Sequence, residues 1–347
     1  MKKLVAVLVL AVTFLNFSFE NSGEARMVFT DTPRFEIPVN FPPPVYKFIN
    51  NPPTNAGFVL GRKLFYDTLL SKDKSIACSN CHQPFAAFAN LDHATSHGVD
   101  FCFGTRNAPA LFNLAWQKEF MWDGGVKHIE FSPLNALTST CEMANTWDTI
   151  LGRLRASTTY PLLFQHAFGS TEINSQKMLR AMAQFTALLI SANSKYDHFI
   201  RKEPGGSFTK DEADGYALFK ANCSSCHTEP LFTNLSFTNN GLDEWSEDPG
   251  RDTITSNPAD RGKFRVPSLR NIALTAPYMH DGRMSTLEEV LNHYTSGMKM
   301  NPALDSIFIR SGNPGIVLNA AEKKRLMAFL KTLTDSEFTG NRLFAEQ

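Results

Sequence analysis

The chain has 347 residues, with 34 basic and 34 acidic side chains. This length suits about two domains of about 100–200 residues each. Because the charges balance, the composition gives no indication of nucleic acid or an anionic membrane as a partner.

The N-terminus predicts export. Met1-Lys2-Lys3 precedes an apolar run from Leu4 to Phe17, which is the pattern of a secretory signal peptide. The run is shorter than the about 20 residues that a membrane-spanning helix needs, and no other stretch approaches that length. We therefore assign residues 1–25 to a signal peptide and expect a periplasmic protein with no membrane span in its mature form.

The first half of the chain combines helical periodicity with a long irregular stretch. Residues 27–54 are rich in Pro, Asn and Phe and predict an extended arm, and Asn55 is expected to cap a helix that ends near Tyr66. The stretch from Ala86 to Met143 has no sustained period and would need a buried cofactor to order it. Helical periodicity returns in two later segments, Thr146–Ala156 and Ser175–Ile200.

The second half begins after the clearest linker, Pro204-Gly205-Gly206-Ser207. We set the domain boundary there, with one domain at residues 27–203 and another at residues 207–347. Three S/T/N-x-x-E patterns, which are typical of helix starts, follow in this half: Thr209–Glu212, Ser285–Glu288 and Asn319–Glu322. Since no alternating run of useful length occurs, the predicted fold class is mainly α.

Two pentads carry the strongest chemical signal: Cys78-Ser79-Asn80-Cys81-His82 and Cys223-Ser224-Ser225-Cys226-His227. In a C-x-x-C-H pentad, the two thiols can add to the vinyl groups of a haem, and the histidine can bind its iron as an axial ligand. A zinc knuckle would need four ligands close together, and a thioredoxin-like pair has no need of the histidine. We therefore predict two cytochrome c-like helical domains, each built around one covalently bound c-type haem.

The two remaining cysteines, Cys102 and Cys141, are candidates for a disulfide, because an oxidising compartment favours pairing of thiols. The alternative is two unrelated buried thiols.

Six further motifs surround the pentads: Gly61-Arg62-Lys63-Leu64-Phe65, Arg106-Asn107-Ala108-Pro109, Phe120-Met121-Trp122-Asp123-Gly124, Pro230-Leu231-Phe232, Val266-Pro267-Ser268-Leu269-Arg270-Asn271 and Leu274-Thr275-Ala276-Pro277-Tyr278-Met279-His280-Asp281-Gly282. In order and spacing, from about Phe58 to Thr334, they resemble the motifs of the bacterial di-haem cytochrome c peroxidases. That family includes the MauG-type enzymes of methylamine utilisation.

The resemblance implies reduction of hydrogen peroxide to water with electrons from a small cytochrome c or cupredoxin. The haem on His82 would bind peroxide, and the six-coordinate haem on His227 would take electrons from the donor. Trp122 matches the tryptophan that lies between the haems in this family, although plain core packing is the alternative for an indole. Homodimers are common in the family.

Glu142 is the predicted proton-transferring residue. It lies twenty positions after Trp122, where the family carries its distal glutamate in an Asn-Pro-x-Glu-Met string, here Ser139-Thr140-Cys141-Glu142-Met143. Where the family often has a glutamine, ten positions after the tryptophan, this chain has Ser132. A solvated surface charge is the alternative for a glutamate in a loop.

Two further sites follow from the resemblance. Asn107, Thr275 and Pro277 match the inter-domain calcium site of the family, and neutral oxygen donors of this kind suit calcium. His97 resembles the histidine that closes the peroxide site in many members, with His93 as its rival and a solvent-facing loop histidine as the alternative.

The sixth ligand of the His227 haem is predicted to be Tyr294, with Met298 as its main rival. Leu287, Val290, Leu291 and Tyr294 are spaced i, i+3, i+4 and i+7, so Tyr294 should share a buried stripe. In the family, the position fourteen residues after His280 holds methionine in the better-known peroxidases and tyrosine in the MauG-type branch. Other candidates are Met279, Met284, His293 and Met300.

Two alternative functions stay open. One is the MauG-like, peroxide-dependent oxidation of a protein side chain, and the other is a di-haem electron carrier with both irons permanently six-coordinate. A carrier would show only low-spin haem and would not react with peroxide.

Overall fold

The computed structural model describes residues 34–91 and 93–347, so the predicted signal peptide lies outside the described residues. The fold is mainly helical, as predicted. The α-helices of the first half are α1 (Asn55–Tyr66), α2 (Cys78–Cys81), α3 (Leu134–Thr138), α4 (Trp147–Ala156), α5 (Tyr160–Phe168), α6 (Ser175–Ala187) and α7 (Lys195–Arg201). Those of the second half are α8 (Lys210–Asn222), α9 (Asp252–Thr255), α10 (Leu287–Asn292), α11 (Ala320–Lys331) and α12 (Ser336–Thr339).

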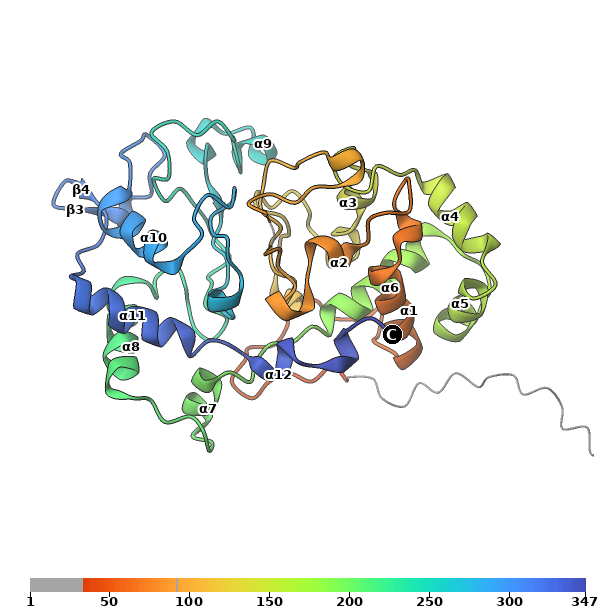
Figure 1. Ribbon diagram of the computed structural model, residues 1–347, viewed down its shortest axis with the longest axis horizontal. Helices are drawn as coiled ribbons and strands as arrows, with labels where there is room; N and C mark the ends of the chain where they lie inside the picture. The colour runs from red at the N-terminus through yellow and green to blue at the C-terminus, as the bar shows by residue number, and fades with distance from the viewer. Residues whose placement is uncertain (1–33, 92) are drawn as a thin grey trace, which may run out of the picture.

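Short elements complete the described chain. Two antiparallel pairs of two-residue strands are β1 (Phe237–Thr238) with β2 (Phe264–Arg265), and β3 (Ile309–Arg310) with β4 (Asn313–Pro314). A π-helical turn, His293–Gly297, continues α10. Single 3₁₀ turns are Thr68–Leu70, Pro84–Ala86, Val99–Phe101, Leu114–Trp116, Ile129–Phe131, Pro258–Asp260, Ile272–Leu274, Ser306–Phe308 and Arg342–Phe344. Figure 1 shows α1–α6 in one half and α8–α11 in the other, with the irregular segments between them.

Each half is built on a close crossing of two helices. In the first half, α1 crosses α6 at Gly61, where a Cβ would lie 2.0 Å from the carbonyl oxygen of Ala181. In the second half, α8 crosses α11 at Gly215, where a Cβ would lie 2.0 Å from the carbonyl oxygen of Arg325. Only a residue without a side chain lets the backbones approach so closely. Buried aliphatic and aromatic residues surround both crossings.

The predicted helix starts are largely correct. The capping boxes Thr209–Glu212 and Asn319–Glu322 are confirmed. The third box lies one residue later than predicted, with Thr286 and Glu289 in place of Ser285 and Glu288. The cap of α1 is Thr54 and not Asn55, because the Thr54 hydroxyl accepts the N–H of Gly57 at 3.0 Å.

The prediction of one helical segment over Ser175–Ile200 is wrong. The chain leaves the helix after Ala187 and re-enters one at Lys195. Between them, Ser191 exchanges two hydrogen bonds of 2.9 Å with the side chain of Asn113, and Ser194 caps α7 together with Asp197. These contacts satisfy backbone groups that a continuous helix would have bonded internally.

The described part of the predicted arm, residues 34–54, contains no helix or strand. It lies on the first half, where the Trp116 indole donates to the carbonyl of Pro42 at 2.7 Å, and the N–H groups of Val45 and Tyr46 donate to Ala115. At Asn40 the arm also reaches Asp197.

The proposed second domain ends with a segment that returns to the first half. After α11, residues 336–347 run back beside α1 (Figure 1). Phe338 and Phe344 pack in one cluster with Phe58 and Phe88. Arg62 and Tyr66 of α1 donate side-chain hydrogen bonds of 2.7 Å to the carbonyls of Leu343 and Phe344.

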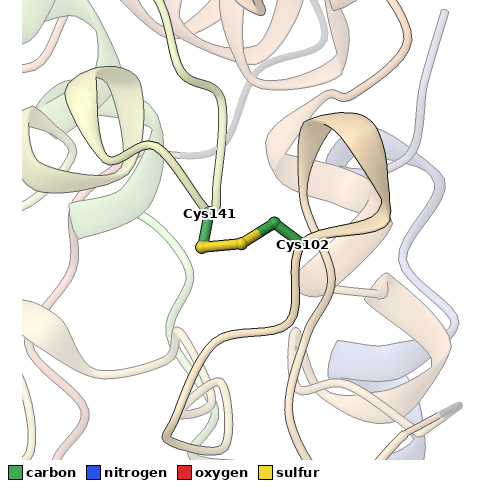
Figure 2. The surroundings of a disulfide bond; sticks show 2 residues. All are labelled: Cys102 and Cys141. Atoms are coloured by element: carbon green, nitrogen blue, oxygen red, sulfur yellow. A yellow bond between two sulfur atoms is a disulfide. The ribbon is translucent and has the colours of Figure 1, made fainter.

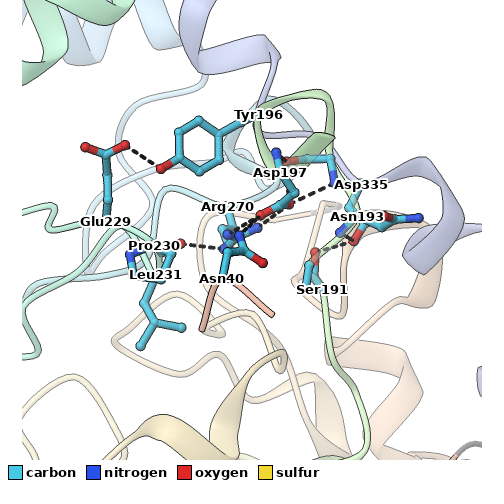
Figure 3. Close-up of polar contacts among 12 residues, drawn as sticks. Asn40, Ser191, Asn193, Tyr196, Asp197, Glu229, Pro230, Leu231, Arg270 and Asp335 are labelled. Carbon is cyan, nitrogen blue, oxygen red and sulfur yellow. Dashed lines mark hydrogen bonds and ion pairs between the residues drawn. The ribbon is translucent and has the colours of Figure 1, made fainter. Parts of the chain in front are cut away.

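A fully buried ion pair links the arm and the two halves (Figure 3). Both terminal nitrogens of Arg270 donate to the carboxylate of Asp197 at 2.8 Å, and neither side chain is exposed. Arg270 Nε donates to the carbonyl of Pro230, and Asn40 donates to Asp197 at 2.8 Å. Nearby, Asp335 accepts from the Ser191 hydroxyl and from the N–H of Asn193.

Within residues 34–91 and 93–347, no helix combines the length and the apolar character that crossing a bilayer requires.

Candidate functional site

Each C-x-x-C-H pentad lines its own cavity. Cys78, Cys81 and His82 line a cavity of about 1110 Å³, called here the Cys78 cavity. Cys223, Cys226 and His227 line a cavity of about 460 Å³, called here the Cys223 cavity. The two thiols and the imidazole of each pentad therefore border one common volume.

The two histidines are held in the same way. His82 Nδ1 donates to the carbonyl of Phe88 at 3.0 Å, and His227 Nδ1 donates to the carbonyls of Phe232 and Pro267 at 3.2 Å. A proton fixed on Nδ1 leaves the lone pair of Nε2 available to a metal ion. Burial lowers the pKa of both imidazoles to about 4, so both rings are neutral at physiological pH.

Arg265 indicates that an anionic group belongs between the cavities. Its side chain is 7% exposed and lines both cavities. Its guanidinium donates one hydrogen bond, to the carbonyl of Met121 at 3.3 Å, and no carboxylate of residues 34–91 and 93–347 forms an ion pair with it. A buried cation without an anion is costly. The carboxylates of a haem would neutralise it, and the residues present therefore fit a haem in each cavity.

Trp122 lies in the wall between the cavities and lines both of them. Its indole N–H donates to the carbonyl of Asn107 at 2.8 Å, and its own carbonyl accepts the N–H of Arg265 at 2.7 Å. Beside it, Arg106 pairs with Asp123 of the first half and Asp248 of the second, each at 2.6 Å. Residues from both halves of the chain therefore meet around the Trp122 indole.

Glu142 faces the Cys78 cavity. Its side chain is exposed, and partial desolvation by the surrounding protein raises the pKa of its carboxyl. Its carboxyl has no hydrogen-bond partner in the part of the chain that the structure describes. Ser132 also lines this cavity, and its hydroxyl donates to the carbonyl of Ile129 at 2.8 Å.

His97 lines the Cys78 cavity, whereas its rival His93 does not. The His97 Nδ1 atom is buried and has no partner among the described residues. The two imidazole rings lie 5.1 Å apart. Of the two histidines, His97 is the one positioned to meet a group bound in this cavity.

The Sγ atoms of Cys102 and Cys141 are bonded to each other in the structure (Figure 2). The four cysteines of the pentads are not bonded to one another.

Leu287, Val290, Leu291 and Tyr294 all line the Cys223 cavity, as their spacing predicts. Leu291 is buried and the other three are half-buried, whereas His293 is buried outside this cavity, so the stripe is confirmed as a shared face and not as a buried one. Met279 lines this cavity as well, while Met284, His293, Met298 and Met300 do not. The Asn240 side-chain amide lies 3.5 Å from the Tyr294 hydroxyl and 3.6 Å from Met279 Sδ. Burial raises the pKa of the Tyr294 phenol.

The three residues of the predicted calcium site, Asn107, Thr275 and Pro277, all line the Cys223 cavity. Asn107 donates its side-chain N–H to the carbonyl of Ala94 at 2.9 Å, which leaves its amide oxygen free to bind a cation. Among the described residues, no group of three or more His, Cys, Asp or Glu side chains could hold a metal ion. The predicted ligands are amide and carbonyl oxygens, which are not of those types.

Asn240 and Arg265 were missed by sequence reasoning. Asn240 lies in no motif, and Arg265 directly precedes the Val266–Asn271 motif without being part of it. Single polar residues outside or beside a motif are too common in sequences for either residue to have been identified as part of a site.

Comparison with known proteins gives consistent results. A family model described as "Di-haem cytochrome c peroxidase" matches residues 55–205. The chain is 35% identical to the methylamine utilization protein MauG of Methylorubrum extorquens, over 86% of this chain and 83% of that protein. It is 33% identical to the cytochrome c551 peroxidase of Nitrosomonas europaea, over 82% of both proteins.

Among solved structures, the chain is similar to a MauG-like protein associated with microbial copper homeostasis. The two share 32% identity with a TM-score of 0.80, over 90% of this chain and 98% of that one.

Proposed function

Because this chain belongs to the di-haem cytochrome c peroxidase family and is an oxidoreductase of the peroxidase type, we propose that it reduces hydrogen peroxide to water with electrons from a small redox protein. The supporting observation is the asymmetry of the two cavities. Glu142 faces the Cys78 cavity, whereas no carboxyl group of residues 34–91 and 93–347 lines the Cys223 cavity, which Tyr294 and Met279 face instead. The Cys78 cavity therefore has a carboxyl group that can transfer a proton. The Cys223 cavity has side chains that can supply a further ligand to an iron.

In this proposal, residues 27–203 carry one haem on Cys78, Cys81 and His82. Residues 207–347 carry the other on Cys223, Cys226 and His227. When bound, the haems supply the iron that binds peroxide and the electrons that reduce it. Arg265 would hold the carboxylates of the haems, and Tyr294 would supply an oxygen ligand to the iron in the Cys223 cavity.

Glu142 provides the acid–base chemistry. Its carboxylate takes the proton from one peroxide oxygen and returns it to the other, which leaves as water. A carboxyl pKa raised by burial suits this role, because a group that both accepts and donates a proton works best with a pKa near the working pH. Trp122 fills the space between the two cavities, where its indole shortens the distance that electrons cross.

The remaining assignments belong to the same proposal. Residues 1–25 direct export to the periplasm, where a small cytochrome c or cupredoxin donates electrons. Asn107, Thr275 and Pro277 supply oxygen ligands to a calcium ion between the halves. His97 would be a ligand to the iron of the Cys78 cavity in one state of the enzyme, which its unpartnered Nδ1 and its position in that cavity support.

Stopped-flow measurement of peroxide reduction with reduced cytochrome c as donor tests the main proposal. We expect donor oxidation at two equivalents per peroxide. A di-haem electron carrier would oxidise no donor with peroxide and would keep an unchanged low-spin spectrum, and that result would refute the proposal.

Oxidation of a protein side chain is the second candidate function. It is supported by Tyr294, which faces the Cys223 cavity, whereas Met298 does not, and by the similarity to MauG. A phenolate oxygen stabilises ferric iron, whereas a thioether favours ferrous iron, so tyrosine ligation favours storage of oxidising equivalents. An oxidised spectrum that persists after peroxide is added without a donor would support this function, and immediate return to the resting spectrum would count against it.

A further inference from the structure

Two irregular segments meet at the rim of the Cys78 cavity. The first, residues 96–104, closes on itself through hydrogen bonds of 2.9 Å from Gly98 N to Cys102 O and from Gly104 N to Ser96 O. The second, residues 139–143, is folded by the hydrogen bond from Glu142 N to Ser139 O at 3.1 Å. The first segment carries His97, and the second carries Glu142.

Three links join these segments. The Cys102–Cys141 disulfide is covalent (Figure 2). Val99 N donates to the carbonyl oxygen of Glu142 at 2.8 Å. Gly98 packs directly on the second segment, since a Cβ at this position would lie 2.2 Å from Glu142 O and 2.4 Å from Glu142 Cα. Two of the three links act on the backbone of Glu142 itself, and the disulfide acts on its neighbour.

The tip of the first segment needs an external restraint. Asp100 and Phe101 are consecutive residues with positive φ, at 60° and 55°, a region that is unfavourable for residues with a Cβ. Both side chains are largely exposed: Asp100 forms a surface ion pair with Lys72, and the Phe101 ring lies 5.9 Å from that of His97. Cys102 follows directly, and its disulfide ties the tip to the second segment.

We propose that the Cys102–Cys141 disulfide, together with Gly98 and Val99, is a positioning device that fixes Glu142 in the Cys78 cavity. The Glu142 carboxyl has no hydrogen-bond partner in the described part of the chain, so its location depends on where its backbone is held. The device also makes His97 and Glu142 parts of one rigid unit. This inference rests on the proposed function, in which Glu142 moves the peroxide proton.

A double-mutant cycle tests whether the disulfide acts through Glu142. Cys102→Ser with Cys141→Ser should lower kcat/KM for peroxide by about 10–100-fold, since a misplacement of about 1 Å can cost about 10²-fold. In a Glu142→Gln background, the same two substitutions should change kcat/KM by less than about twofold, because groups that act as a unit are not additive. Losses that multiply in the combined variant would overturn the proposal.

Two further variants separate positioning from general disruption. Gly98→Ala keeps the disulfide but pushes the backbone of Glu142 away, so it should reproduce the loss in kcat/KM. Asp100→Asn is the matched control in the same loop, because it leaves all three links intact and asparagine tolerates positive φ. It should have wild-type turnover. All variants should retain two covalent haems by mass.

Hydrogen exchange gives a readout that does not depend on turnover. Removal of the disulfide should speed amide exchange in residues 96–104 and 139–145 together, while exchange in α8 and α11 stays unchanged. Unchanged exchange in residues 139–145 would overturn the proposal. If the wild-type protein reduced no peroxide, the proposed function would fail, and the exchange result would still decide whether the disulfide fixes Glu142.

Discussion

Phe88 and Phe232 occupy equivalent places in the two halves. Each is fully buried, and each has a positive φ, at 60° and 54°. The carbonyl of each accepts a hydrogen bond from the Nδ1 atom of the pentad histidine. Unfavourable backbone conformations of this kind persist where the surrounding structure holds them, often at functional sites. Here the conformation turns a carbonyl towards the imidazole while the ring fills the core.

Replacement of Glu142 by glutamine should leave both haems and their spectra nearly unchanged but slow peroxide turnover. The amide keeps the shape of the side chain but cannot take a proton, so we expect a loss of about 10²–10⁴-fold in kcat. Stopped-flow kinetics would measure it. Glu288→Gln, an exposed substitution in α10, is the control and should be neutral. Turnover near the wild-type rate would remove Glu142 from the mechanism.

Tyr294→Phe should change the ferric spectrum of the haem proposed for the Cys223 cavity, because it removes the proposed oxygen ligand. Met298→Leu should leave that spectrum unchanged, since Met298 does not line the cavity. Met279→Leu is the informative companion, because Met279 faces the same cavity. The near-infrared band of thioether ligation, as in His/Met cytochromes, should be absent from the wild-type protein. If that band were present and disappeared in Met279→Leu, methionine would be the ligand.

Site residues that belong to a short sequence motif could be predicted. Site residues whose partners are distant in the sequence could not. The pentads could be identified because each short stretch contains both thiols and the imidazole. The position of Tyr294 in the Cys223 cavity could be predicted because helical spacing places it on the same face as Leu287 and Leu291. The role of Arg265 could be inferred only from the fold, which places its guanidinium between two cavities with no carboxylate of the described residues paired to it. No local sequence pattern contains that relationship.

At the level of elements, the two halves repeat one arrangement. In each, a glycine lets the helix before the pentad lie against a later helix, at Gly61 on Ala181 and at Gly215 on Arg325. A phenylalanine four residues further along the later helix packs on the same glycine, namely Phe185 in α6 and Phe329 in α11. The repeat of motif seen in the sequence is therefore also a repeat of packing.

Gly215→Ala should destabilise the protein by about 1–3 kcal/mol or more, the usual cost of overpacking a core, because its Cβ would meet a backbone carbonyl at 2.0 Å. Gly152→Ala in α4 is the matched control. Its Cβ meets no atom within 4 Å, and alanine favours helix over glycine by about 1 kcal/mol. Chemical denaturation should rank the two variants on opposite sides of the wild-type protein. Equal stabilities would contradict the close crossing.

Capping boxes were predictable because both partners lie within one turn of helix. The break between α6 and α7 was not, because it depends on Asn113, which is about 78 residues away along the chain from Ser191. The apolar periodicity continues through the break, and Leu189 is fully buried although it lies outside the helix. Long-range hydrogen bonds therefore override a local pattern at that point.

At the scale of the whole molecule, the Asp197–Arg270 pair joins three parts of the chain. The arm contributes Asn40 to the carboxylate and places the Phe41 ring 4.7 Å from the guanidinium. Burial alone would raise the pKa of Asp197, but hydrogen bonds and charge from Arg270 lower it to about 2. The Asp197 carboxyl is therefore ionised throughout the physiological range.

Asp197→Asn should lower stability at pH 7 by roughly 3–5 kcal/mol, because it leaves Arg270 buried without its anion. The pKa of Asp197 is about 2 in the folded state and about 3.9 when unfolded. Its contribution is thus complete above about pH 4 and is lost as pH falls towards 2. The variant should show a flatter dependence of unfolding free energy on pH in that window. Glu172→Gln, which removes a largely exposed carboxylate, is the control and should lose far less stability than Asp197→Asn.

The return of residues 336–347 to the first half has a consequence for biogenesis. These residues are made after all those before them, yet Phe338 and Phe344 complete the cluster around Phe88, whose carbonyl holds His82. The core beside the first pentad therefore cannot close while they are missing. Cys78 packs against the same cluster. We therefore expect attachment of the proposed haem to Cys78 and Cys81 to precede closure of this core.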